Sequence, residues 1–190
     1  GSETIVNLSM SSLIKKIGMD LNLYNSKWAP CWIINFPMFE TNSDGELTPL
    51  HHPFTLPQCN SDELKNNPDT SLAYAYDVVL NGYEIGGGSL RIFDKSMQET
   101  VFETLKISKE EATNKFGFLL KALSSGCPPH GGIAFGLDRI VMLVTDTTNI
   151  RDVIAFPKTQ SAACLLTEAP SKVDEKQLDE LKIISTHKEE

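Results

Sequence analysis

The feature that most restricts the fold of this sequence is a predicted β-hairpin near its middle. Two runs rich in apolar and β-branched residues, residues 72–80 and 83–93, flank the dipeptide Asn81-Gly82. Asn-Gly between two such runs is the strongest short-range signal for a two-residue hairpin, because a type I′ turn needs a positive φ at both positions. We therefore expect an antiparallel sheet built around this hairpin.

Shorter signals add further elements to the hairpin. Extended segments are predicted over residues 31–36, 47–54 and 132–135, and residues 57–71 are predicted to form a polar surface loop. Helices are predicted around residues 13–21, 137–144 and 152–156, and after two capping boxes, Ser96 with Glu99 and Ser108 with Glu111. Because strands and helices do not alternate as in βαβ units, the predicted fold class is α+β, an antiparallel sheet flanked by helices.

Composition narrows the class of protein. Hydrophobic residues make up 41% and charged residues 22%, as in ordinary globular domains, and no apolar run approaches the roughly 18 residues of a membrane span. The net charge of −8 is unlike that of a compact nucleic-acid-binding module, so if the protein binds RNA, we expect other segments to make the main phosphate contacts. The four cysteines include no CxxC pair, which argues against zinc or a disulfide framework and favours reduced thiols in the cytosol.

Two acidic residues stand on opposite arms of the hairpin. If Asn81-Gly82 forms the loop, Val79 faces Glu84 and Asp77 faces Gly86, so the carboxylates of Asp77 and Glu84 are diagonal neighbours that can share one face. Two such carboxylates repel each other, and Mg²⁺ bound together with substrate phosphates would relieve the repulsion. A pair of solvated charges is the ordinary alternative, and the pattern alone favours it.

A run of glycines precedes an arginine in the second arm. Three glycines, residues 86–88, weaken a strand and indicate a bulge or a ligand lying against the backbone. Arg91 could hold a carboxylate through two parallel hydrogen bonds, and a surface arginine is an equally supported alternative. His51 and His52 lie in a predicted extended segment, where adjacent side chains point to opposite faces, so at most one is expected to face a site.

The segment GIAFGLDRIV, residues 132–141, passes from a strand through Gly136 directly into a helix. Asp138 and Arg139 fall in the first helical turn, where the helix dipole attracts anions. Asp138 could simply compensate the dipole. A cation opposes it, so Arg139 indicates a bound phosphate or an aromatic base.

These segments together resemble known proteins. Residues 132–139 resemble the third signature motif of class II aminoacyl-tRNA synthetases, with Ala134 at a common glycine position and Asp138 in place of the commoner Glu. Four more stretches resemble aspartyl-tRNA synthetases of the bacterial type: LHHPFT (50–55), NGYEIGGGS (81–89), PPHG (128–131) and NIRDVIAFPK (149–158). The resemblance runs from about Lys27 to Pro170, and several long motifs in the same order make it specific.

The resemblance implies an organisation for the chain. Residues 1–26 would hold a tag-cleavage scar, Gly1-Ser2, and the end of an insertion domain; residues 27–170 would be the C-terminal half of the catalytic domain; residues 171–190 would be a tail. The enzyme would be an aspartate–tRNA ligase, and this fragment would be inactive alone because the first two class II motifs are absent from it.

The resemblance also implies roles for single residues. Glu84 would bind ATP and, with Asp77, Mg²⁺, while His51 and Arg91 would bind L-aspartate, Arg91 taking its side-chain carboxylate. The ATP site would also include Gly136, Leu137, Asp138 and Arg139. Glu84 and Arg139 would be the catalytic residues.

Partners and alternatives follow from the same family. Aspartate would attack the α-phosphate of ATP, and the adenylate would then acylate the 3′ end of tRNA-Asp, which would be bound mainly through other domains. The whole enzyme would be a cytoplasmic homodimer that does not enter membranes. A class II ligase for asparagine or lysine is the nearest alternative, and Arg91 argues against lysine because two cations would meet. A non-catalytic homologue that binds an adenylate or a protein partner is the other, and the joint presence of Asp77, Glu84, Arg91 and Arg139 argues against it.

Overall fold

The computed structural model describes residues 1–184 and 186 of the chain. It contains two compact units, Gly1–Leu137 and Asp138–Glu190, and each is considered by itself. None of the helices in the described part combines the length and the apolar character needed to cross a bilayer.

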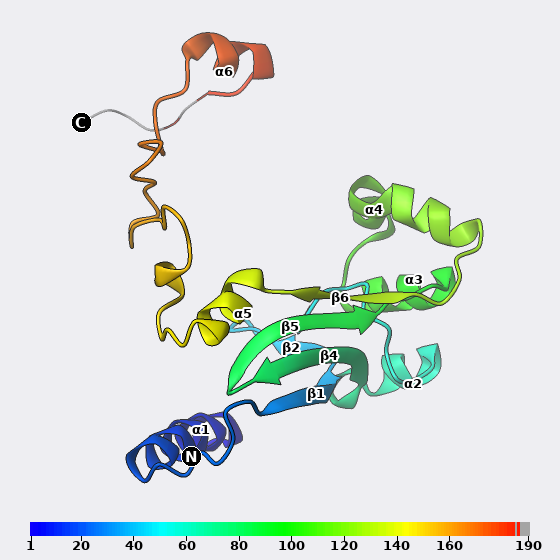
Figure 1. The fold of residues 1–190 in the computed structure, drawn as a ribbon. Coiled ribbons are helices and arrows are strands. Elements are labelled where there is room, and N and C mark those ends of the chain that lie inside the picture. The colour runs from blue at the N-terminus through cyan, green and yellow to red at the C-terminus, as the bar shows by residue number, and fades with distance from the viewer. Residues whose placement is uncertain (185, 187–190) are drawn as a thin grey trace. The chain divides into compact units, whose positions relative to one another are not determined.

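A four-stranded antiparallel sheet forms the centre of the first unit (Figure 1). Its strands, in spatial order, are β1 (Pro30–Pro37), β4 (Leu72–Leu80), β5 (Tyr83–Leu90) and β6 (Gly131–Phe135). A second, two-stranded antiparallel sheet pairs β2 (Phe39–Thr41) with β3 (Leu47–Pro49). The predicted α+β class, an antiparallel sheet flanked by helices, is therefore confirmed.

The turn between β4 and β5 has the predicted conformation, but the strand register differs from the prediction. Asn81 and Gly82 have φ values of 52° and 81°, the left-handed values that a type I′ turn requires. Val79 faces Glu84 as expected. The register then shifts between Val78 and Val79, which leaves Ile85 without a partner on β4, so Asp77 faces Gly87 and not Gly86. This β-bulge, an extra residue on one strand, cannot be predicted by counting residues outwards from the turn.

The polar segment 57–71 was predicted to be a surface loop, but it also contains helices. It contains the helix α2 (Ser61–Asn66) and the 3-10 helix η1 (Pro68–Thr70). A reciprocal capping box starts α2, because the Asn60 side chain accepts from the Glu63 N–H at 2.9 Å and the Glu63 carboxylate accepts from the Asn60 N–H at 3.2 Å. That Asn-x-x-Glu spacing is present in the sequence and was the signal for this helix.

Three longer helices complete the first unit: α1 (Glu3–Asp20), α3 (Lys95–Thr104) and α4 (Lys109–Ser124). Ser108 caps α4 as predicted, accepting from the Glu111 N–H at 3.1 Å. The predicted cap of α3 is wrong. Asp94 is the N-cap and accepts from Met97, while Ser96 already lies inside the helix and donates to Asp94. Asp94 has the extended backbone that an N-cap residue adopts, and Ser96 does not occupy that position.

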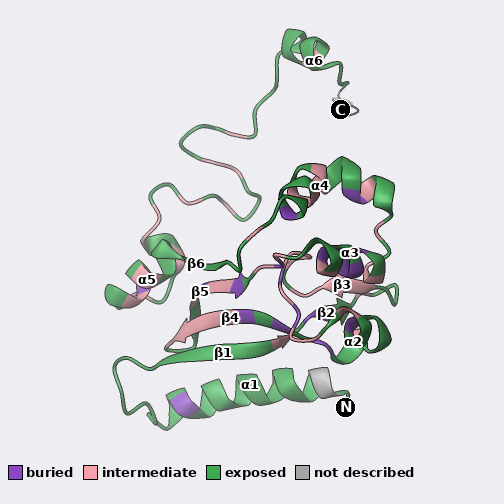
Figure 2. Ribbon diagram, turned by 90° about the vertical axis from the view of Figure 1, so that its right-hand side faces the viewer, coloured by how far each residue is buried: buried purple, intermediate pink, exposed green. Residues whose placement is uncertain are grey.

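The buried core of the first unit lies where β4 meets α2 and α3 (Figure 2). Ala73 and Ala75 contribute from β4, Leu64 from α2 and Val101 from α3. Leu64 and Val101 are fully buried. The hairpin is thus anchored at its β4 start, and the segment that follows β5 runs directly beside this core through Ile92.

The second unit has less regular structure. It includes most of α5 (Leu137–Val144), the 3-10 helix η2 (Ile150–Asp152) and α6 (Glu175–Leu181). The predicted α5 is confirmed. The predicted helix over residues 152–156 is instead the shorter η2, which starts earlier because the Asn149 side chain accepts from the Arg151 N–H. The predicted tail from residue 171 contains α6, and residues 185 and 187–190 lie outside the described part.

Candidate functional site

Arg91 and His52 form the centre of the candidate site. Arg91 follows β5 and is half-buried, and its Nη1 lies 3.0 Å from Nδ1 of His52. The backbone holds the two residues together, because Thr55 forms an isolated antiparallel bridge with Arg91. The Arg91 N–H also donates to the His130 carbonyl oxygen at 2.8 Å. The backbone of Arg91 is therefore held by Thr55 and by His130.

His52 is held in its neutral form. Burial, and then the positive charges of Arg91 and His51, lower the pKa of His52 from 6.5 to about 4. Its Nδ1 accepts hydrogen bonds from Arg91 and from the Phe54 N–H at 3.2 Å, and neither of these groups can accept one. The remaining proton therefore sits on Nε2. The imidazole orients the guanidinium without neutralising its charge.

The paired histidines were predicted to lie in an extended segment, and this prediction is wrong. Strand β3 ends at Pro49, and the Thr55 N–H donates to the His52 carbonyl oxygen at 3.2 Å, which closes a turn. His51 is exposed, and its ring contacts Phe36 edge-on at 4.7 Å. His52, to which no role was assigned from the sequence, is thus the histidine that contacts Arg91. A role for His51 in binding aspartate stays a prediction.

Asp77 and Glu84 approach the same point on β5. A Cβ atom placed on Gly87 would lie 2.5 Å from Oδ1 of Asp77 and 3.8 Å from Oε1 of Glu84. A side chain at position 87 would therefore displace the Asp77 carboxylate, which occupies that space. The two carboxylates share one face of the hairpin despite the shifted register.

The environment of Asp77 changes the pKa of its carboxyl group. Burial, and then the negative charge of Glu84, raise the pKa of Asp77, while His51 acts weakly in the opposite direction. Repulsion between like charges favours any cation placed between them. Across the described residues there is no group of three or more His, Cys, Asp or Glu side chains arranged to hold a metal ion. Two carboxylates are a ligand set of the kind that Mg²⁺ accepts together with oxygen ligands from water or phosphate.

Protein contacts account for the other two glycines of the run. A Cβ on Gly86 would lie 2.7 Å from the ring of Phe135, and one on Gly88 would overlap the carbonyl oxygen of Gly132. Both contacts come from β6, the neighbouring strand. Close approach of β6 thus explains these glycines without a ligand on the backbone.

The predicted nucleotide-binding segment begins at the end of β6. The Gly136 N–H donates to the Ile85 carbonyl oxygen at 2.8 Å, which extends the pairing with β5 by one residue. Leu137 is 71% exposed and starts α5. Asp138 and Arg139 follow in the first helical turn and are exposed; they open the second unit. The predicted direct passage from strand to helix is confirmed, and the nucleotide-binding roles stay predictions.

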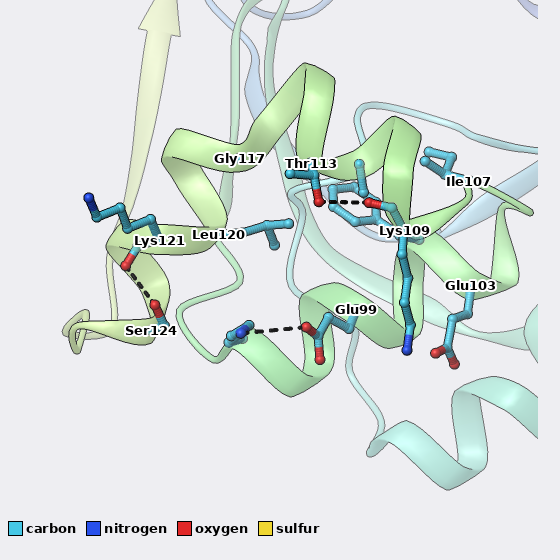
Figure 3. A pocket seen from close by; sticks show the side chains of 12 residues that line it. Glu99, Glu103, Ile107, Lys109, Thr113, Gly117, Leu120, Lys121 and Ser124 are labelled. Atoms are coloured by element: carbon cyan, nitrogen blue, oxygen red, sulfur yellow. Dashed lines mark hydrogen bonds and ion pairs between the residues drawn. The ribbon is translucent and has the colours of Figure 1, made fainter.

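A separate cavity of about 330 Å³ lies between α3 and α4 (Figure 3). Its wall combines the apolar side chains of Phe102 and Leu120 with charged ones such as Glu99 and Lys109. Lys95 and Glu99 at its rim form an ion pair at 3.7 Å. None of the predicted site residues lines this cavity, so it is distinct from the site around Arg91.

A protein-family model described as tRNA synthetases class II (D, K and N) matches residues 3–160. Three solved structures are similar in fold. The aspartyl-tRNA synthetase from Entamoeba histolytica is 22% identical, with a TM-score of 0.52, over 77% of this chain and 25% of that chain. The asparaginyl-tRNA synthetase of that organism, in complex with asparaginyl-adenylate, is 20% identical, with a TM-score of 0.53, over 71% and 26%. The asparaginyl-tRNA synthetase from Pyrococcus horikoshii is 22% identical, with a TM-score of 0.51, over 70% and 27%.

These comparisons have two consequences. At such identities the solved structures show the fold alone, and they include enzymes named for both aspartate and asparagine. The chain spans about a quarter of the length of each of them.

Proposed function

This chain belongs to the class II tRNA synthetases of the D, K and N group, and from that premise we propose that it is part of the catalytic domain of an aspartate–tRNA ligase of the bacterial type. In the proposed reaction a carboxylate oxygen of L-aspartate attacks the α-phosphorus of ATP and pyrophosphate leaves. A hydroxyl at the 3′ end of tRNA then attacks the activated carbonyl carbon, AMP leaves, and the proton of the hydroxyl passes to the departing phosphate. Both steps transfer a group between bound substrates.

The observation that carries this proposal is the contact between Arg91 and His52. A half-buried guanidinium that donates to a neutral imidazole keeps its charge and its remaining N–H groups for another acceptor. A carboxylate accepts two parallel hydrogen bonds from a guanidinium, and an uncharged amide offers one weaker acceptor. This favours aspartate over asparagine as the amino acid held at Arg91.

The residues proposed for ATP lie on the hairpin and at the start of α5. Glu84 and Asp77 would hold Mg²⁺, since their carboxylates converge over Gly87. The ion would offset the negative charge of the ATP phosphates. Gly136, Leu137, Asp138 and Arg139 would line the nucleotide site, with the Arg139 cation near phosphate or adenine. His51, which is exposed on the turn that also carries His52, would contact the amino acid.

Catalysis by this set would rest on positioning and charge. Arg91 would hold the aspartate side chain, His52 would orient Arg91, and Arg139 together with a cation held by Asp77 and Glu84 would stabilise charge on the phosphates. None of these groups has to exchange a proton with the substrate, since holding the attacking carboxylate next to the α-phosphate supplies much of the rate enhancement. Glu84 and Arg139 are accordingly the proposed catalytic residues.

The proposed partners are those of the whole enzyme. They are L-aspartate, tRNA-Asp and a second copy of the enzyme in a homodimer, in the cytoplasm. Since the chain carries a net charge of −8, tRNA phosphates would be contacted mainly by other parts of the enzyme.

Amino-acid-dependent exchange of pyrophosphate into ATP by the complete protein tests the proposal. Exchange with aspartate but not with asparagine or lysine is expected. Exchange with asparagine alone would reassign the amino acid. Tight binding of an aspartyl-adenylate analogue without any exchange would instead support a non-catalytic homologue.

A further inference from the structure

Gln98 is a fully buried polar residue that the proposed reaction does not use. It lies in the second turn of α3, is 0% exposed, and its neighbours on the helix are the core residues Val101 and Phe102. Its Nε2 donates to the carbonyl oxygen of Pro53 at 2.8 Å. The side chain thus joins α3 to the turn that carries His52.

The other end of the Gln98 amide is unsatisfied. Within the described residues, Oε1 of Gln98 has no hydrogen-bond donor although it is buried. A buried carbonyl without a partner is destabilising, whereas an apolar side chain of similar size avoids this cost. An apolar side chain would, however, remove the donor to the Pro53 carbonyl oxygen. The bond to Pro53 is what the amide supplies.

The Pro53 carbonyl is well placed to control His52. Pro53 is the next residue after His52, and the following Phe54 N–H donates to His52 Nδ1 at 3.2 Å. The Phe54 carbonyl oxygen in turn accepts from the Ile92 N–H at 2.9 Å, one residue beyond Arg91. A shift of the peptide between Pro53 and Phe54 would therefore move the Phe54 N–H donor directly. It would act on the Arg91 donor through the bond between Phe54 and Ile92.

We propose that Gln98 is a positioning residue of the aspartate pocket, which sets the orientation of the Arg91 guanidinium through Pro53 and His52. This inference rests on the proposed function of Arg91. Gln98 reaches the turn through its hydrogen bond to the backbone carbonyl of Pro53. Its loss should loosen the geometry of Arg91 and leave the residues proposed for ATP in place.

The test compares two glutamines in the complete protein. Gln98→Met keeps the length of the side chain and removes the donor. Gln58→Met is the matched control, because Nε2 of Gln58 also donates to a backbone carbonyl, that of Ala73, at 2.9 Å, and this bond involves neither Pro53 nor His52. The measurements are the KM values for aspartate and for ATP in pyrophosphate exchange, with circular dichroism to verify folding.

We expect Gln98→Met to raise the KM for aspartate about five- to tenfold, the effect of losing one hydrogen bond at the pocket. The KM for ATP and both constants of Gln58→Met should stay near the wild-type values. Equal changes in both KM values of Gln98→Met, or the same change in Gln58→Met, would overturn the inference.

Gln98→Glu provides a second test if Gln98→Met does not fold. A buried carboxyl group has a raised pKa and stays protonated in mildly acidic solution, where its O–H can donate to Pro53. The ratio of its aspartate KM to that of the wild type should approach one near pH 5.5 and rise at about pH 8. A ratio that is the same at both pH values would contradict the positioning role.

Arg91→Lys in the same assay separates the two proposals. If Arg91→Lys raises the aspartate KM and the Gln98 variants do not, only the role of Gln98 is overturned. If the wild type shows no aspartate-dependent exchange, or if Arg91→Lys leaves the aspartate KM unchanged, the proposed pocket is overturned and the role of Gln98 falls with it.

Discussion

Nη1 of Arg91 lies 3.0 Å from Nδ1 of His52, so a permanent cation donates to a neutral ring and not to a carboxylate. No carboxylate forms an ion pair with Arg91 within residues 1–184 and 186. The positive charge is therefore oriented but not neutralised. An arginine used only for stability would gain more from an acidic partner, which is consistent with the proposal that Arg91 binds a substrate carboxylate.

Replacing Arg91 by lysine should weaken aspartate binding far more than ATP binding. Lysine keeps the charge but lacks the planar fork that pairs with a carboxylate, and it cannot reproduce the contact with His52. We expect a loss of about 2–4 kcal/mol in the transition state for aspartate activation. Steady-state exchange kinetics with each substrate varied in turn measure it. An unchanged kcat/KM for aspartate would remove Arg91 from the pocket.

His52 should make the protein less stable in mild acid. Its pKa is about 4 in the folded protein and 6.5 when solvated, so between these values the unfolded chain binds a proton that the folded chain does not. The contribution of His52 is complete above pH 6.5 and decreases as the pH falls towards 4. His52→Asn lacks this contribution. The difference in Tm between wild type and variant should therefore shrink between about pH 7.5 and pH 4.5, and a constant difference would refute the neutral imidazole.

Asp77→Asn should relieve repulsion in the absence of ligands. The pKa of Asp77 is raised by burial and by Glu84, so its charged form destabilises the fold at neutral pH and protonation stabilises it as the pH falls through that pKa. The Tm of the ligand-free variant should be equal to or above that of the wild type. The additional rise in Tm that Mg²⁺ gives in the presence of ATP should be smaller in the variant. A full Mg²⁺-dependent rise would remove Asp77 from the proposed cation site.

Arg139→Ala should abolish most of the rise in Tm caused by ATP with Mg²⁺. Arg139 stands in the first turn of α5, where a cation opposes the helix dipole by up to about 1 kcal/mol. An anionic or aromatic group of the nucleotide at that place would reverse the sign of the interaction. Thermal shift at a fixed ATP concentration compares variant and wild type. If ATP stabilises both equally, Arg139 does not touch the nucleotide.

Some features could be predicted because they depend on neighbouring residues only. The turn at Asn81-Gly82 and the N-cap at Ser108 both have the predicted form. The missed helix α2 is of the same kind, since its capping residues Asn60 and Glu63 are three positions apart. In each case φ preferences or a hydrogen bond across three residues decide the structure.

Other features depend on residues distant in sequence. The contact of His52 with Arg91 joins positions 39 residues apart, and that of Gln98 with Pro53 joins positions 45 apart. The adjacent histidines could not be ranked from the sequence, because the alternation that would separate them requires an extended strand, and the chain turns at Thr55 instead.

The sequence by itself determined that Asp77 and Glu84 stand on the two arms of one hairpin, that Arg91 follows a glycine-rich strand, and that the chain resembles class II synthetases. Only the tertiary structure decided which atoms meet. The bulge at Ile85 places Asp77 over Gly87, and the turn after β3 turns His52 towards Arg91. Local steric preferences fix the turn and the caps, whereas bulges and side-chain partners are set by packing between strands and helices that local sequence does not encode.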